Sequence, residues 1–237
     1  MFTDLHCHLL HGVDDGAKTP EETLAMARAL VALGFSAVAP SPHARPQYPG
    51  PEAVETRRVE VQALLDQHAI PLTLHHSAEN YLDGDFLERE LAGTGRHIAG
   101  TKYVLVELPY EAPVPALPEL LYKLRRKGIR PVIAHPERCM EFENKGRAEE
   151  AVRIGAYLQL DVGSLAGRYG KPARKVGQRL LEEGLYAIAA TDLHAPIHAE
   201  KWLAESMKLL RGAAGDSAEK KLFDENPGRM LRGEELE

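Results

Sequence analysis

The chain reads Thr3-Asp4-Leu5-His6-Cys7-His8 near its beginning, followed by Gly12-Val13-Asp14-Asp15-Gly16. Alternate side chains of a strand share a face, so His6 and His8 are predicted to point the same way and Cys7 the other way. Two imidazoles with the carboxylate of Asp14 close behind them provide half of a metal site. A pair of surface histidines beside a glycine turn is the alternative interpretation of a lone His-x-His. The metal interpretation therefore requires further ligands from the rest of the chain.

Short apolar segments alternate with helical patterns along most of the sequence. Thr19 as N-cap, Pro20 at the first helical position and Glu22 three residues after the cap predict the first helix, which Gly34 ends. This alternation predicts an α/β fold with a parallel sheet covered by helices, and seven such units favour a closed or nearly closed barrel over an open sheet. The predicted strands are residues 2–8, 35–39, 71–75, 103–106, 131–134, 156–162 and 186–190. We expect a single domain over residues 1–237, with a polar tail from about Gly233.

Composition excludes several classes of function. The 237 residues carry 35 acidic and 29 basic side chains, which gives a formal charge of -6. A nucleic-acid-binding surface would need clustered lysine and arginine side chains. Two cysteines, Cys7 and Cys139, form no disulfide framework and fit a reducing cytoplasm. We expect no signal peptide, because no basic and then apolar segment precedes the histidines, and no membrane insertion, because no apolar run approaches about 18 residues.

Residues that commonly bind metals recur where the predicted strands end. In an α/β barrel these ends form one face, where active sites lie, so the side chains are expected to converge. Each alone has another interpretation, such as a loop cap or an ion pair, and as a set they suit Mn, Fe or Zn. Nine ligands exceed the needs of one ion and imply a cluster of two or three. The candidate ligands are His6, His8, Asp14, His43, Glu79, Glu107, His135, Asp192 and His194.

A cluster of divalent ions favours hydrolysis of a phosphate ester, or of an amide, because closely spaced ions activate water and clamp the oxygens of an in-line displacement. Arg138, three residues after His135, is predicted to hold phosphate oxygens, with a surface ion pair as the alternative. A cysteine phosphatase is excluded, since its Cys-x5-Arg motif would need arginine where Val13 and Lys145 stand. The P-loop motif is also absent.

Several stretches together carry a resemblance to a known family. They include residues 12–19 (GVDDGAKT), residues 78–82 (AENYL), residues 135–138 (HPER), residues 163–165 (GSL) and residues 191–194 (TDLH). The chain resembles PHP-domain (polymerase and histidinol phosphatase) metallohydrolases, and most closely the bacterial CpsB/CapC/YwqE-type protein-tyrosine phosphatases. The resemblance implies a distorted (β/α)7 barrel and a metal-dependent phosphatase linked to capsular or exopolysaccharide synthesis. It further implies phosphotyrosine on a polysaccharide-export kinase as substrate, and homo-oligomers in the form of rings.

The resemblance also implies a trinuclear centre that usually prefers manganese. One ion would be held by His6, His8, Glu79 and Asp192. A second ion would share Glu79 and add Glu107 and His135, and the third would be held by Asp14, His43 and His194.

Two positions depart from the family pattern. Family members carry a second phosphate-binding arginine shortly after the Asp-x-His pair, whereas residues 195–200 here read APIHAE. His198, Arg45 and Arg168 are the candidates to replace it, and Asp161 stands where an asparagine is usual. A small-molecule phosphatase such as histidinol phosphatase, a phosphodiesterase and a non-catalytic metal-containing binding module therefore remain alternatives.

Overall fold

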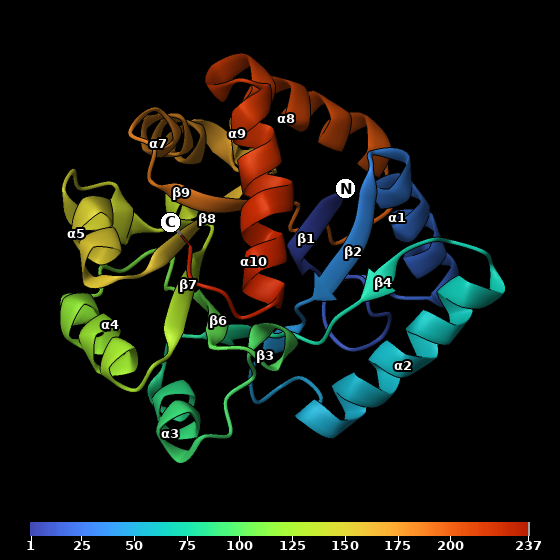
Figure 1. Ribbon diagram of the computed structural model, residues 1–237, viewed down its shortest axis with the longest axis horizontal. Coiled ribbons are helices and arrows are strands. Elements are labelled where there is room, and N and C mark those ends of the chain that lie inside the picture. Colours follow the sequence, from blue (N-terminus) through green and yellow to red (C-terminus); the bar gives the residue numbers. More distant parts are fainter. Residues whose placement is uncertain (237) are drawn as a thin grey trace.

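Strands occupy the interior of the molecule and helices surround them in the computed structural model, which describes residues 1–236 (Figure 1). Two short strands, β3 and β5, were not predicted; they carry His43 and Glu79, and the predicted strand at 71–75 is reduced to β4. The strands are β1 (Phe2–Cys7), β2 (Phe35–Pro40), β3 (His43–Ala44), β4 (Thr73–Leu74), β5 (Glu79–Tyr81), β6 (Tyr103–Glu107), β7 (Arg130–Ala134), β8 (Tyr157–Asp161) and β9 (Tyr186–Ala190).

All strand pairs are parallel, as the alternation with helices predicts. They form two sheets, in the orders β1-β2-β4 and β3-β5-β6-β7-β8-β9. A parallel bridge between Cys7 and Leu193 joins the end of β1 to the segment after β9. The predicted α/β barrel is confirmed, and its division into two sheets is what distorts it.

The helices follow the predicted pattern, including the C-terminal part of the chain. The side chain of Thr19 accepts a hydrogen bond from Glu22 N at 3.3 Å, which confirms the predicted start of the first helix. No helix within residues 1–236 has both the length and the apolar character needed to cross a bilayer. The helices are α1 (Pro20–Ala32), α2 (Pro51–Gln67), α3 (Gly84–Ala92), α4 (Leu117–Arg126), α5 (Arg147–Ile154), α6 (Val162–Leu165), α7 (Gly170–Glu182), α8 (Ala199–Ala214), α9 (Asp216–Lys220) and α10 (Asn226–Leu231).

Buried apolar side chains form two clusters, one inside the ring of strands and one between strands and helices. The inner cluster includes Leu5, Leu105, Val132 and Ile188, and Met230 from α10 belongs to it. In Figure 1, α10 accordingly lies across the strands at one end of the barrel. Glu107 follows Leu105 by two residues on β6, so strand alternation places its carboxylate on the same inward face, at the other end of the barrel.

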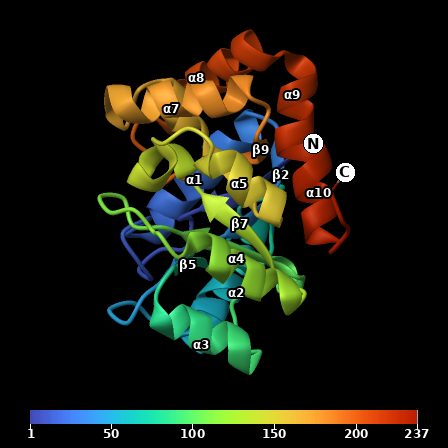
Figure 2. The same cartoon turned by 90° about the vertical axis from the view of Figure 1, so that its left-hand side faces the viewer.

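The two ends of the barrel have different roles. Figure 2 shows α10 and both chain ends on one side, while the arrow of β7 points toward the opposite side. Residues 233–236, the described part of the expected polar tail, lie at the α10 end, where Glu235 pairs with Lys102 and Arg130 at 2.8 Å each; Glu237 is outside the described residues. The carboxyl ends of the strands are thus free for a site on the other side.

Candidate metal centre

Imidazoles and carboxylates meet at the carboxyl ends of the strands. They come from β1, β3, β5 and β6 and from the segments that follow β1, β7 and β9. Four overlapping groups among them place their ligand atoms within 4.8 Å of one another. Eight of the nine predicted ligands belong to these groups, and Asp15 joins them. The groups are His6, His8 and Glu79; His6, His135 and Asp192; His43, Glu79 and Glu107; and His8, Asp15, His43 and His194.

His6, on β1, and His8, directly after β1, both direct Nε2 toward the same point. Their Nε2 atoms lie 3.3 Å apart, and Asp192 Oδ1 lies 3.2 Å from that of His6 and 3.3 Å from that of His8. The outer nitrogens are anchored, His6 Nδ1 by Gln159 Oε1 at 2.8 Å and His8 Nδ1 by Asp14 Oδ2 at 2.7 Å. This anchoring fixes both rings with Nε2 directed into the centre.

Glu79 spans the centre with its two oxygens. Its Oε1 lies 2.9 Å from His135 Nε2 and 3.5 Å from His6 Nε2. Its Oε2 lies 2.8 Å from His43 Nδ1 and 3.6 Å from His8 Nε2. A buried carboxylate that faces imidazoles with both of its oxygens can act as a metal ligand through either oxygen.

Asp14 is the predicted ligand that lies outside these four groups. Its Oδ2 is bonded to His8 Nδ1 and also accepts from His43 N at 3.2 Å, and its Oδ1 accepts from Gly16 N at 2.9 Å. Asp15 instead supplies the oxygen near the ring nitrogens, with Oδ1 at 3.3 Å from His43 Nε2 and 3.6 Å from His194 Nε2. The turn through Gly12–Gly16 accounts for the different directions of Asp14 and Asp15, because it directs the side chain of Asp14 back toward β1.

Gly16 is required for this turn. A Cβ atom at position 16 would lie 2.2 Å from His8 O and 2.5 Å from His8 Cβ. The clash is with backbone and the base of a side chain, neither of which can rotate away. The absence of a side chain at Gly16 therefore lets the turn pack against the ligand-bearing strand.

Two candidate ligands have unusual backbone conformations. His135 has φ 29° and Asp192 has φ 48°, a region that residues other than glycine seldom adopt. Both follow the end of a strand, and Asp192 N is held by His6 O at 2.9 Å. Such strain persists where the surrounding structure enforces it, and here it turns both side chains toward the centre.

The donor set fits a group of divalent cations. Glu79 Oε2 and Asp192 Oδ1 are buried and accept no hydrogen bond of normal geometry among residues 1–236, although imidazole nitrogens lie 2.8 Å and 3.2 Å from them. Leaving such atoms unsatisfied costs about 1–3 kcal/mol each. Bound cations would satisfy the oxygens and the ring nitrogens at once, and mixed nitrogen and oxygen donors suit Mn, Fe or Zn.

The electrostatics of the centre also favour cations. Burial lowers the pKa of His6, but Glu79 and Asp192 oppose burial and raise it to about 9. Burial likewise lowers the pKa of His43, while Asp15 and Glu79 raise it to about 9. In the metal-free protein, protons on these imidazoles therefore supply the positive charge that the carboxylates require.

Metal uptake is expected to release protons at pH 7.5. Because their pKa values are raised to about 9, His6 and His43 are protonated at that pH and must lose a proton to bind a metal. The apparent affinity for Mn²⁺ should therefore increase as the pH rises from 7 toward 9. Calorimetric titration in buffers of different ionisation enthalpy measures the protons released, and equal heats in all buffers would contradict the expectation.

Gln159 contacts the candidate ligand His6 and was not identified by the sequence analysis. It lies on β8, fully buried, and its Oε1 accepts from His6 Nδ1. The sequence feature that could have identified Gln159 is its position as a polar residue between two leucines, Leu158 and Leu160, in a predicted strand. By holding the proton on Nδ1, Gln159 leaves the Nε2 lone pair of His6 for a metal.

Gln159→Leu is expected to weaken metal binding by about 10- to 100-fold, since it removes the partner that fixes the ring of His6. Competition with a chromophoric chelator measures the affinity. Gln178→Leu on the exposed face of α7 is the matched control and should leave it unchanged. Equal affinity of Gln159→Leu and the wild type would show that the amide does not position His6.

Arg138 lies at the rim of the centre, in a position fixed from several sides. Its Nη1 donates to Asp192 Oδ2 at 2.6 Å and its Nη2 donates to Tyr110 Oη at 2.9 Å. Its guanidinium carbon lies 4.1 Å from the centroid of the Tyr169 ring.

Because Asp161 is buried and faces Asp192 and Glu137, its pKa is raised well above the usual range. Asp161 is therefore favoured as the neutral acid, which accounts for a carboxyl group where an asparagine is usual.

Arg45 and Arg138 line the same pocket, whose volume is about 240 Å³. Arg45 pairs with Glu107, and its guanidinium carbon lies 4.4 Å from the centroid of the Tyr81 ring. Of the three candidates for the missing second arginine, Arg45 is the one in this pocket. Arg168 and His198 line a neighbouring cleft instead.

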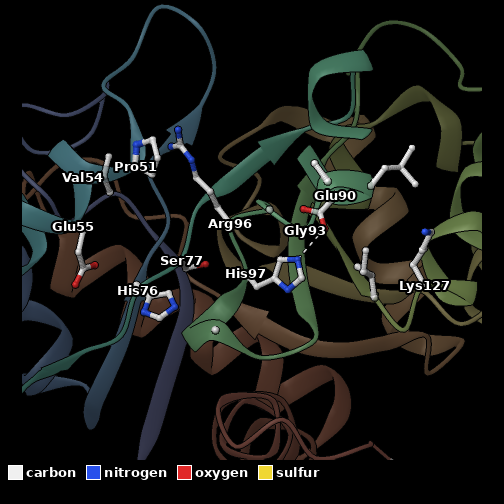
Figure 3. Close-up of a pocket in the computed structure, with 15 residues that line it drawn as sticks. Pro51, Val54, Glu55, His76, Ser77, Glu90, Gly93, Arg96, His97 and Lys127 are labelled. Atoms are coloured by element: carbon white, nitrogen blue, oxygen red, sulfur yellow. Dashed lines mark hydrogen bonds and ion pairs between the residues drawn. The ribbon is translucent and has the colours of Figure 1, made fainter. Parts of the chain in front are cut away.

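A larger cavity of about 930 Å³ lies away from the metal centre (Figure 3). Its walls include Pro51 at the start of α2 and Glu90 on α3, and none of the nine predicted ligands lines it. Figure 3 shows a dashed line between Glu90 and His97 in this cavity, and Glu90 Oε2 lies 2.8 Å from His97 Nε2. Cavity volume therefore does not identify the active site in this fold, whereas the convergence of ligands does.

Comparison with known proteins agrees with the geometry. The family model for capsular polysaccharide synthesis proteins of the CpsB/CapC type matches residues 2–232. The tyrosine-protein phosphatase YwqE of Bacillus subtilis is 36% identical over 195 residues, 81% of this chain and 76% of that protein. The tyrosine-protein phosphatase CpsB of Streptococcus agalactiae serotype III is 27% identical over 237 residues, covering 97% of this chain and 98% of that protein.

Solved structures give the same result. A chain from the crystal structures of YwqE from Bacillus subtilis and CpsB from Streptococcus pneumoniae, described as unique metal-dependent tyrosine phosphatases, has a TM-score of 0.91 at 31% identity and covers 99% of this chain and 96% of its own. An organophosphorus hydrolase from Deinococcus radiodurans, with a TM-score of 0.57 and 17% identity over 97% of this chain and 92% of its own, shares the fold alone. Together with the ligand cluster and the HPER arginine, these matches establish that the chain belongs to the CpsB/CapC family of capsular polysaccharide synthesis proteins.

Proposed function

We propose that this protein is a metal-dependent phosphatase that hydrolyses phosphotyrosine on protein substrates and takes part in capsular or exopolysaccharide synthesis. The observation that carries the proposal is the buried ligand cluster with Arg138 at its rim, bonded to Asp192. The relatives named as tyrosine-protein phosphatases support the choice of substrate.

We propose that two or three ions are bound, with Mn as the first candidate and Fe or Zn as alternatives. His6, His8, Glu79 and Asp192 would hold one ion, and Glu79, Glu107 and His135 a second. His43 and His194 would hold a third with Asp15, while Asp14 orients His8. Bound divalent ions would supply Lewis-acid charge for the phosphoryl oxygens and lower the pKa of a water molecule.

The chain's own residues bind and orient the phosphoryl group. The pocket of about 240 Å³ has room for this small anion, with Arg45 and Arg138 on its walls. Asp192 and Tyr110 hold Arg138 in the wall of this pocket, so its positive charge is positioned before charge develops on the phosphoryl oxygens. A phenol has a pKa of about 10, so a tyrosine leaving group departs more readily than an aliphatic alcohol.

Further parts of the proposal concern the cellular setting. We propose a tyrosine kinase of polysaccharide export as the substrate protein, homo-oligomers of this chain, one domain over residues 1–237 and a cytoplasmic location. The family description supports the process, and the free, buried thiols of Cys7 and Cys139 suit a reducing compartment.

The test compares initial rates on a phosphotyrosine peptide and on histidinol phosphate, after chelation and again after addition of Mn²⁺. We expect metal-restored hydrolysis of the peptide in preference to the small ester. Hydrolysis of histidinol phosphate alone would contradict phosphotyrosine as the substrate and indicate a small-molecule phosphatase. No hydrolysis of either, with metals bound, would favour a non-catalytic binding module.

A further inference from the structure

We propose that the cleft beside the metal pocket, formed by Arg168, Tyr169, Ile197, His198 and Trp202, binds the substrate segment next to the phosphotyrosine and that Arg168 selects an acidic side chain there. This inference rests on the proposed function, because it concerns the protein part of the same substrate. The cleft has a volume of about 580 Å³.

The cleft adjoins the metal pocket. Arg138, Asp192 and His194 line both cavities. The metal pocket, at about 240 Å³, is too small for more than a phosphoryl group and part of a ring, so the peptide must continue outside it. A substrate peptide whose phosphoryl group contacts Arg138 can therefore place its neighbouring residues in the cleft.

Arg168 is placed for recognition by its packing. Its guanidinium carbon lies 3.9 Å from the centroid of the Trp202 ring, on α8. Its backbone N donates to Gly163 O at 3.1 Å, and a Cβ on Gly163 would lie 2.9 Å from Arg168 Cδ. The aliphatic stem thus rests on a glycine while the head stacks on an indole, which limits the conformations of an exposed side chain.

The charge of Arg168 remains available. Arg45 and Arg138 are paired with Glu107 and Asp192, whereas Arg168 has no carboxylate oxygen within 4.0 Å among residues 1–236. Stacking uses the face of the guanidinium and leaves its in-plane N–H groups free to bind a carboxylate through two hydrogen bonds.

The cleft has a net positive charge on a protein that is acidic as a whole. Arg138 and Asp192 pair with each other in its wall, so among the described residues Arg168 is the unpaired charge that lines it, while the formal charge of the chain is -6. Such a local reversal of charge favours an acidic ligand over a neutral or basic one. Ile197, whose exposed fraction is 73%, adds an apolar contact at the edge of the cleft.

The test uses peptides that differ only beside the phosphotyrosine, where they carry aspartate, alanine or lysine, together with free phosphotyrosine. Arg168→Gln should raise KM for the aspartate peptide about tenfold and leave kcat/KM for free phosphotyrosine within about twofold. Arg168→Glu should reverse the preference between the aspartate and lysine peptides. Arg153→Gln, an exposed arginine on α5, is the matched control.

A binding measurement separates this inference from the proposed function. Trp202 is the one tryptophan of the chain, so its fluorescence reports on the cleft directly. Peptides with a non-hydrolysable phosphonate in place of the phosphate should change this fluorescence with tighter binding of the aspartate form, and Arg168→Gln should remove the difference. If that result is obtained without hydrolysis of any peptide, the cleft is established and the phosphatase proposal fails.

Two outcomes would overturn the inference while hydrolysis persists. One is an equal loss on peptides and free phosphotyrosine in Arg168→Gln, which would place Arg168 at the phosphoryl group. The other is no preference of the wild type for the aspartate peptide.

Discussion

Replacing Glu79 by glutamine is expected to lower kcat on a phosphotyrosine peptide by about 10³-fold or more. The carboxylate lies between four imidazoles, with Oε1 at 2.9 Å from His135 Nε2 and Oε2 at 2.8 Å from His43 Nδ1. Glutamine keeps the shape but removes the negative charge and directs an N–H group at ligand atoms. A decrease of about 10³-fold in kcat corresponds to the loss of about 4 kcal/mol of transition-state stabilisation by the bound metals.

The measurement combines kcat at saturating Mn²⁺ with the metal content of the purified protein. Glu119→Gln on the exposed face of α4 is the matched control, and we expect both quantities to equal those of the wild type. A Glu79→Gln protein that retained its metals and more than a tenth of the wild-type kcat would contradict a central role for this carboxylate.

Arg138→Ala is expected to lower kcat/KM by about 10²- to 10³-fold, the usual effect of removing a preorganised donor to a developing anion. Arg138 is oriented by Asp192 at 2.6 Å and by Tyr110 at 2.9 Å, and its planar head lies against Tyr169. Arg138→Lys should recover only part of the loss, because an ammonium group cannot reproduce the planar fork or the stacking.

Metal content distinguishes a loss of phosphate binding from a loss of the centre, since Arg138 also neutralises Asp192. We expect Arg138→Ala to retain its metals and to bind inorganic phosphate more weakly. Arg153→Ala serves as the control for removal of an exposed arginine. Unchanged phosphate affinity together with reduced metal content would assign Arg138 a structural role instead.

The predicted fold followed from local features of the sequence. The N-cap at Thr19, the apolar runs and the glycines between them determine where helices and strands begin and end. Helices between successive strands require parallel pairing, which places all strand ends on one face. For that reason candidate ligands as distant in the chain as His8 and His194 lie together, with ring centroids 3.9 Å apart.

The two short strands β3 and β5 could not be predicted from sequence patterns. Strands of 2 and 3 residues, such as His43–Ala44 and Glu79–Tyr81, are too short to show an alternation of side chains. Pairing with neighbouring strands defines them, and they hold two of the candidate ligands in register, His43 opposite Glu79.

The sequence by itself determined the parallel α/β architecture, the end of the barrel that carries the site and the chemical types of its ligands. Only the tertiary structure decided that Asp15 faces the centre while Asp14 orients His8, that Gln159 holds His6, and that Arg45 and Arg168 occupy different cavities. The physical reason is that periodicity and spacing are properties of neighbouring residues. The direction of a side chain in a tight turn, and its partner from another strand, depend on packing between segments that are far apart in the chain.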